Sequence, residues 1–166
     1  MFEKFNTPAE AYNFKLGATL KMEHKILEIL EADIEAAQDD KVEALLRTHQ
    51  TESQEHVRSV EEVFGLFGWD VEESACPAIE GLEKEGAGMV KKTDDSLVDS
   101  VILQGAVEVE HHEIGVYENL LINANAMNRQ DVVAVLARIC KSEQSALDKV
   151  KELQAEVAAV TPKVAA

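Results

Sequence analysis

Hydrophobic residues recur at every third or fourth position over four long stretches of the chain, and residues with high helix propensity fill the positions between them. Thr7 and Pro8 form a helix start signal before the first stretch, and glycines follow the second. Short polar breaks divide the first stretch from the second and the third from the fourth. The pattern predicts four long helices, over residues of about 8–37, 41–68, 96–125 and 129–160.

The lengths of the connections indicate how these helices pack. A short turn joins the first helix to the second, and another joins the third to the fourth, so each pair forms an antiparallel hairpin. Residues 69–95 form a long crossover between the hairpins, with one short helix expected over about 78–85. A crossover of this length lets the third helix run parallel to the second. We therefore predict a single all-α domain over residues 1–166, a ferritin-like four-helix bundle with residues 161–166 as a tail.

Each predicted apolar stripe is interrupted by a glutamate. The four interrupting residues are Glu23, Glu52, Glu110 and Glu143. An unpaired carboxylate costs several kcal/mol in a protein core, and four that face one another repel. Each lies about 13 to 17 residues from the turn of its hairpin, so at about 1.5 Å of rise per residue all four can meet in one layer. Because divalent cations neutralise such charge and occupy the carboxylate lone pairs, the pattern predicts a metal centre.

Further ligand candidates lie on the same helix faces. Glu113 follows Glu110 at i+3, and His56 follows Glu52 at i+4. Dimetal bundles use one glutamate from each of two helices and Glu-x-x-His from the other two, but no histidine follows Glu143 at i+3 here. We therefore predict a carboxylate-rich site for two divalent metal ions, iron or manganese. Its predicted ligands are Glu23, Glu52, His56, Glu110, Glu113 and Glu143.

Three polar side chains on these faces, including the candidate ligand His56, have two interpretations each. His49 and His56 either bind a metal ion or donate a hydrogen bond to a glutamate that does. Tyr117 is either a core tyrosine with a satisfied hydroxyl or a group with a hydrogen-bonding or radical role beside the metals. The sequence leaves these alternatives open.

Composition excludes several classes of function. The net charge is −16, from 32 acidic and 16 basic residues. A protein that binds nucleic acid needs a basic surface, and an anionic membrane repels a chain of this charge, so we expect neither partner. No apolar run has the length of a membrane span. Cys76 and Cys140 lie far apart with no CxxC pair, which favours reduced thiols and a cytoplasmic location.

Four segments around the candidate ligands resemble a known family. They are KMEHK (21–25), HQTESQEH (49–56), VEHHEIGVY (109–117) and EQS (143–145). These segments resemble the YciE/YciF-type ferritin-like proteins, in the same order, and the likeness covers roughly residues 16–150. The third segment is the most specific, since it is similar to the V-E-H-Y-E-I-x-x-Y of the family. The segment 76–86 is also similar to the crossover of that family.

The resemblance implies a ferritin-like bundle, a homodimer and an association with bacterial stress responses, in a family without an established biochemical activity. The chain departs from the family at His112, where a tyrosine is usual. It departs again at Ser142 and Gln144, where the family tends to have a pair of glutamates. This second departure leaves Glu143 as the sole ligand from the last helix. A more distant resemblance is to rubrerythrins, although this chain has no CxxC pairs of the rubredoxin type.

Three functions agree with this sequence. In the first, a reduced dimetal centre reacts with peroxide or dioxygen, and Glu113 is the carboxylate that shifts as the oxidation state changes. In the second, the protein stores or buffers metal. In the third, the bundle is a non-catalytic stress or interaction protein whose inner glutamates are protonated or bonded to His49 and His56.

Overall fold

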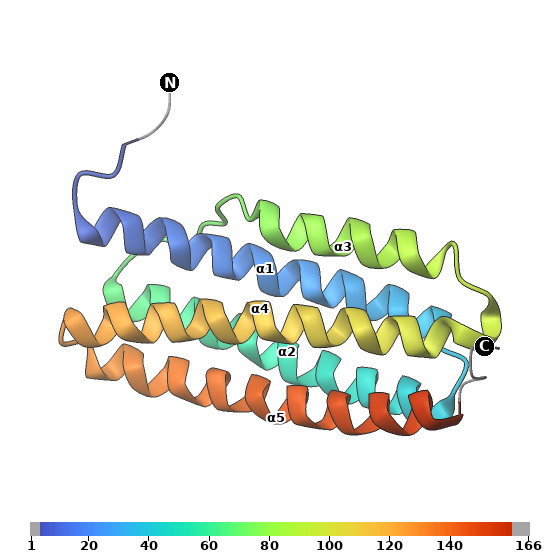
Figure 1. The fold of residues 1–166 in the computed structure, drawn as a ribbon. Coiled ribbons are helices and arrows are strands. Elements are labelled where there is room, and N and C mark those ends of the chain that lie inside the picture. Colours follow the sequence, from blue (N-terminus) through green and yellow to red (C-terminus); the bar gives the residue numbers. More distant parts are fainter. Residues whose placement is uncertain (1–3, 161–166) are drawn as a thin grey trace.

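The computed structural model describes residues 4–160, so the tail predicted for 161–166 lies outside the described residues. Four long helices lie side by side, with α1 antiparallel to α2, α4 antiparallel to α5, and α4 parallel to α2 (Figure 1). This arrangement confirms the all-α, ferritin-like bundle of two hairpins. The elements are α1 (Pro8–Ala36), α2 (Asp40–Phe67), α3 (Pro77–Val90), the 3-10 helix η1 (Asp95–Leu97), α4 (Val98–Ala126) and α5 (Gln130–Val160).

Local signals place the ends of the first two helices. The hydroxyl of Thr7 accepts a hydrogen bond from the backbone N–H of Glu10 at 3.2 Å, which caps α1. Asp39 caps α2 in the same way, since its carboxylate accepts from the N–H of Lys41 at 2.7 Å. Gly68 ends α2 with a φ of 71°, a left-handed conformation that glycine adopts without a steric penalty.

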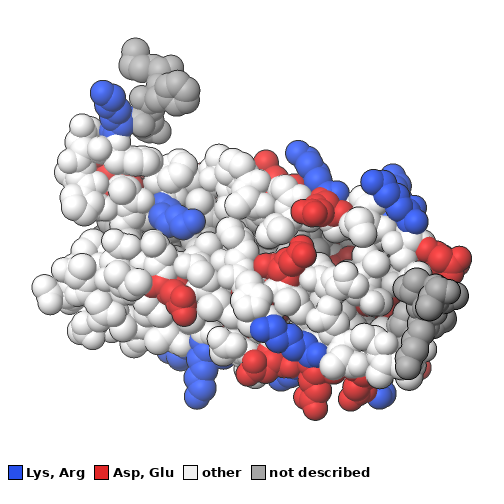
Figure 2. Space-filling view, in the orientation of Figure 1, with Lys and Arg blue, Asp and Glu red and all other residues white. Residues whose placement is uncertain are grey.

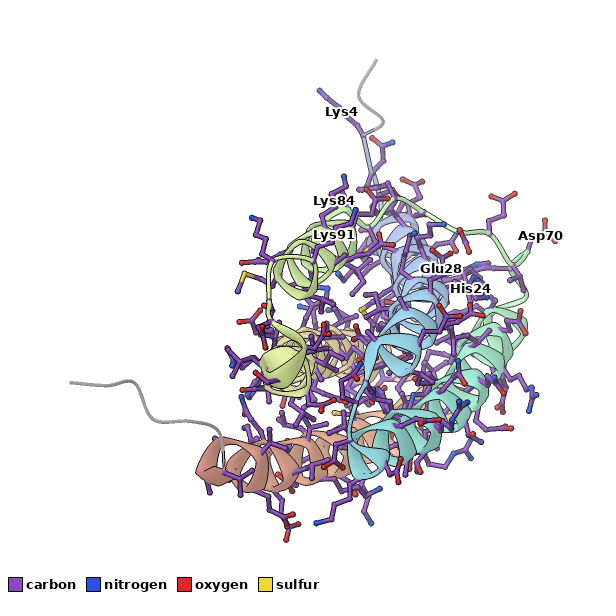
Figure 3. The ribbon with its side chains drawn as sticks, turned by 90° about the vertical axis from the view of Figure 1, so that its right-hand side faces the viewer. Lys4, His24, Glu28, Asp70, Lys84 and Lys91 are labelled. Atoms are coloured by element: carbon purple, nitrogen blue, oxygen red, sulfur yellow. The ribbon has the colours of Figure 1, made fainter. Side chains whose placement is uncertain are left out.

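The crossover helix α3 is longer than the sequence predicts. We expected it over about 78–85, with Gly86 and Gly88 in the loop that follows, but it continues to Val90. Glycine lowers helix propensity by about 1 kcal/mol relative to alanine, and packing against other helices routinely overrides that preference. Here α3 packs against α1 and α4 on the outside of the four-helix bundle, which Figure 3 shows in a view along the bundle.

A polar layer divides the apolar core. On α1, buried Leu16 and Leu20 precede Glu23, and buried Ile26 and Leu30 follow it. The buried polar residues among those described come from all four long helices, so the layer crosses the whole bundle. They are Thr19, Glu23, His49, Ser53, His56, Glu110, Glu113 and Glu143.

The surface agrees with the charge pattern of the sequence. On the face in Figure 2, acidic and basic side chains intermingle over the half of the bundle near the C-terminus, and the opposite end carries few charges. That face has no continuous basic patch. None of the described helices is long and apolar enough to cross a membrane.

The substitution Gly17→Ala tests the contact between α1 and the segment that follows α2. An added Cβ would lie 2.6 Å from the carbonyl oxygen of Glu72 and 2.7 Å from the hydroxyl of Ser74, so the backbone has to shift. We expect a loss of roughly 1–3 kcal/mol in the free energy of unfolding, measured by urea denaturation. The control is Gly115→Ala on α4, where the Cβ meets nothing within 4 Å. That change should stabilise the protein by roughly 0.5–1 kcal/mol, and equal stability of the two variants would contradict the contact.

Candidate metal centre

Four glutamate side chains converge in the middle of the bundle. Glu23 comes from α1, Glu110 and Glu113 from α4, and Glu143 from α5, and each is at most 2% exposed. Their positions follow from the apolar stripes of their helices, because residues three or four positions away on the same face are buried core residues. The structure therefore brings together four of the six predicted ligands on these three helices.

Glu52 does not belong to this layer, and the expectation that it faces the core is wrong. Its side chain is 30% exposed, and its carboxylate lies 3.5 Å from the Lys149 ammonium and 3.7 Å from Nδ1 of His49. Ser53 is fully buried in its place. From Val42 to Val63 the buried residues of α2 alternate steps of four and three residues, and this spacing includes Ser53 and leaves out Glu52. A shift of one residue turns a side chain by about 100° around the helix axis. The buried residues of α2 are Val42, Leu46, His49, Ser53, His56, Val60 and Val63, which follow this alternation, and Phe64.

Two histidines of α2 lie in the layer that Glu52 was expected to join. Nε2 of His49 lies 3.2 Å from Oε1 of Glu110, and Nδ1 of His56 lies 2.8 Å from Oε1 of Glu143. His56 was among the predicted ligands, whereas His49 was left with an open role. The sequence already placed His49 on the inner face of its helix, and the structure adds its contact with Glu110.

The six buried side chains form two groups in which the candidate ligand atoms all lie within 4.8 Å of one another. Glu143 belongs to both groups, so its carboxylate can bridge two metal positions. The second group has one ligand fewer than the first. The first group is His49, Glu110, Glu113 and Glu143, and the second is Glu23, His56 and Glu143.

The donor atoms of these groups fit a pair of divalent cations. Both carboxylate oxygens of Glu113, and one each of Glu23, Glu110 and Glu143, are buried without a hydrogen bond from a nitrogen or from a Ser, Thr or Tyr hydroxyl. An unsatisfied buried polar atom costs about 1–3 kcal/mol, and such atoms are rare in folded proteins. Four ionised carboxylates carry four negative charges, which two divalent ions balance. The residues present therefore suit a dimetal site in both charge and lone pairs.

Without metal ions, the cluster holds protons at neutral pH. Burial raises the pKa of Glu23 to about 7, and repulsion by Glu143 adds to the rise. Burial likewise raises the pKa of Glu110 to about 8 and that of Glu113 well above its usual range. Burial lowers the pKa of His49, but the nearby carboxylate of Glu52 and the charges of the cluster glutamates outweigh it and raise the pKa to about 9.

Tyr117 has a defined partner in this cluster. Its side chain is fully buried, and its hydroxyl donates a hydrogen bond to Oε1 of Glu23. Burial and the negative charge of Glu23 raise the pKa of this hydroxyl well above its usual range, so it stays protonated and remains a donor. Tyr117 therefore orients the Glu23 carboxylate and leaves its second oxygen free for a metal ion.

Other titratable residues of α1 lie outside the cluster. His24 pairs with Glu73 at 2.5 Å, and Glu28 with Lys25 at 2.5 Å, both near the surface. Glu23 is thus the one glutamate of α1 that the structure directs into the core.

Comparison with known proteins agrees with the fold. The family described as a domain of unknown function (DUF892) matches residues 7–161. Among curated proteins no match was found. The solved structure of YcfI from Rhodopseudomonas palustris, for which a structural role has been suggested, is 27% identical with a TM-score of 0.87, over 91% of this chain and 98% of that chain.

Two further solved structures share the fold at lower identity. The Escherichia coli stress protein YciF is 20% identical with a TM-score of 0.87, over 94% of this chain and 99% of that chain. A protein from Xanthomonas campestris pv. campestris is 16% identical with a TM-score of 0.74, over 92% of this chain and 94% of that chain. The family match over nearly the whole chain, together with these folds, confirms the resemblance noted in the sequence. This chain therefore shares its fold with YciF and belongs to the DUF892 family.

Proposed function

We propose that the buried cluster binds two divalent metal ions, iron or manganese, with Glu143 between them, and that the reduced centre reacts with peroxide or dioxygen. The observation that carries the proposal is the set of buried carboxylate oxygens on α1, α4 and α5 that receive no hydrogen bond from a nitrogen or from a Ser, Thr or Tyr hydroxyl. Protein cores rarely tolerate even one such atom, whereas a pair of cations accounts for all of them. The ligands in this proposal are Glu23, His49, His56, Glu110, Glu113 and Glu143.

Each residue has a distinct task in this proposal. Bound iron or manganese supplies one-electron redox chemistry when it is reduced. Tyr117 holds Glu23 in one orientation, whereas Glu113 hydrogen-bonds with the carboxyl of Glu143 and has no N–H or Ser, Thr or Tyr hydroxyl partner, so the Glu113 carboxylate is the group better able to change its binding mode. Glu52 pairs with His49 from outside the cluster and orients that imidazole.

The biological setting belongs to the same proposal. YciF is a stress protein with this fold, and we propose a role for this chain in a bacterial stress response. We further propose a cytoplasmic homodimer, since the resemblance implies a dimer and the two cysteines are free. Storage of metal in a closed shell ranks lower, because nothing in the sequence indicates such an assembly.

A non-catalytic scaffold is the second candidate, and the raised pKa values favour it. Burial raises the pKa of Glu23 to about 7 and that of Glu110 to about 8, so protons alone can neutralise much of the cluster. His49 and His56, each beside a glutamate, neutralise more of it. The structural role suggested for YcfI points the same way. In this case the protein binds no stoichiometric metal.

Metal content separates the two candidates. After anaerobic loading with ferrous or manganous ions and removal of excess metal, we expect about two ions per chain by mass spectrometry. Glu143→Ala should lose both ions, because Glu143 belongs to both ligand groups. Glu52→Ala should keep about two ions, since its carboxylate lies outside both groups. Full metal loading of Glu143→Ala, or loss of both ions in Glu52→Ala, would contradict this ligand assignment.

Peroxide consumption tests the reaction. Ferrous-loaded protein should consume hydrogen peroxide with about two ferrous ions oxidised per peroxide, since each ion gives one electron and peroxide accepts two. The rate should exceed that of Glu110→Ala, treated with the same amount of iron, by at least about tenfold. The measurement is stopped-flow absorbance alongside a peroxide assay. Equal rates in the two proteins would rule out a reaction at this cluster and leave free iron as its source.

The metal-free protein should lose stability as pH rises. Burial raises the pKa of Glu110 to about 8, so the folded chain keeps a proton that the unfolded chain releases above its ordinary pKa of 4.5. The free energy of unfolding of the wild type therefore falls as the pH rises from about 4.5 to 8. The side chain in Glu110→Gln cannot ionise, so the free energy of unfolding of this variant should increase relative to that of the wild type across the same pH range.

Urea denaturation in the presence of a chelator, at a series of pH values, measures this gain. The matched control is Glu118→Gln, on the exposed face of the same helix, which should show no gain that grows with pH. A difference between Glu110→Gln and wild type that stays constant from pH 4.5 to 8 would mean that the Glu110 carboxyl ionises in the folded protein as it does in water.

A further inference from the structure

A cavity of about 610 Å³ lies between α1, α3 and α4 and reaches the candidate metal centre. Apolar side chains make most of its wall, among them Ile26 and Leu30 of α1 and Ile102 of α4. Its inner end includes His49 and Glu110, two members of the first ligand group. The cavity is therefore continuous with the buried cluster.

Small residues on three helices leave this space open. They are Ala32 on α1, Gly86, Ala87 and Gly88 on α3, and Gly105 and Ala106 on α4. A Cβ added at Gly86, Gly88 or Gly105 meets nothing within 4 Å, so larger residues would fit at all three positions. Glycine within a helix costs about 1 kcal/mol relative to alanine. The chain thus accepts three helix-weakening residues around one cavity instead of filling it.

Asp33 lies in the wall of this cavity, and it is the acidic residue of α1 there that lacks a hydrogen-bond or ion-pair partner. Its side chain is partly buried, and burial alone raises its pKa to about 6, with no contribution from a neighbouring charge or hydrogen bond. The carboxylate is therefore ionised above neutral pH, in a largely apolar wall. A partly buried charge of this kind is stabilised by an oppositely charged partner.

We propose that the cavity is the binding site of a small apolar molecule that carries one amino group, with its ammonium at Asp33 and its apolar body directed toward Glu110 and His49. The charges support a cation, because five acidic residues of the wall outnumber its basic residues Lys84, Lys91 and His49, and the chain carries a net charge of −16. The five, not counting Glu110, are Glu28, Asp33, Glu83, Glu85 and Glu108. Lys84 and Lys91 lie on the side of α3 that faces away from α4 (Figure 3).

Binding in this cavity needs only its walls and Asp33. Any reaction of the bound molecule, by contrast, rests on the proposed function, since it depends on metal ions at Glu110 and His49. The two ideas therefore have separate tests, and the first can be carried out on metal-free protein.

The first test uses the neutral fluorescent probe N-phenyl-1-naphthylamine. Metal-free protein should bind one probe per chain, and Gly105→Leu and Ala106→Leu should each weaken binding at least tenfold because their side chains fill the cavity. The control is Gly115→Leu, on the exposed side of the same helix, which should stay within twofold of wild type. Circular dichroism and thermal unfolding check that each variant is folded. Absence of probe binding, or equal binding by all variants, would overturn the proposal.

The second test compares head groups of equal chain length at pH 8. Octylamine should displace the probe at a concentration at least tenfold lower than octanoate or octanol requires. Asp33→Asn should abolish that preference and leave the affinity for the neutral probe within twofold. Equal displacement by the amine and the carboxylate, or an unchanged preference in Asp33→Asn, would overturn the assignment of the amino group.

Metal content separates a failure of this inference from a failure of the proposed function. Asp33→Asn and Gly105→Leu should both keep about two ions per chain, because neither residue belongs to a ligand group. Probe binding by a protein that takes up no metal would refute the dimetal proposal and support the cavity. Full metal loading without probe binding would refute the cavity and support the dimetal proposal.

Discussion

The burial of four carboxylates in one layer is the constraint on which this structure depends. Glu23, Glu110, Glu113 and Glu143 are almost fully removed from water, and their mutual repulsion is far larger than the marginal stability of a domain can absorb. The charge must therefore be neutralised wherever the protein is folded. Protons, the two histidines of α2 and metal ions are the three available means, and the hydroxyl of Tyr117 contributes by donating to Glu23.

The two functional readings differ only in which of these means the cell uses. With protons and histidines, the layer is a polar network inside a scaffold, which agrees with the role suggested for YcfI. With two divalent ions, it is a redox centre whose ligands come from four helices. Glu113 favours the second reading, because it is fully buried beside other carboxyls, and a network built for structure alone would supply it with N–H or hydroxyl donors.

The crossover helix connects the fold to the site. α3 packs on α1 and α4 outside the bundle, yet Ile79 is the one residue that it buries completely. Small residues on its inner side leave an apolar cavity that ends at Glu110 and His49. A helix that served only to join two hairpins would fill this space, since a cavity loses packing energy. In the proposed use of the cavity, the crossover gives the buried layer its access to small molecules.

The sequence by itself determined the four long helices, their pairing into hairpins and the inward direction of four glutamates. Apolar periodicity and capping residues carry that information locally, and on α1, α4 and α5 the apolar stripe passes through the glutamates themselves. Tertiary structure decided the rest. On α2, Glu52 and Ser53 are both compatible with an apolar stripe, and packing against α1 and α5 turned Ser53 inward in place of Glu52. Likewise, contacts with α1 and α4 extend α3 through Gly86 and Gly88 to Val90. The energy of packing exceeds the difference in helix propensity between glycine and alanine, which is about 1 kcal/mol.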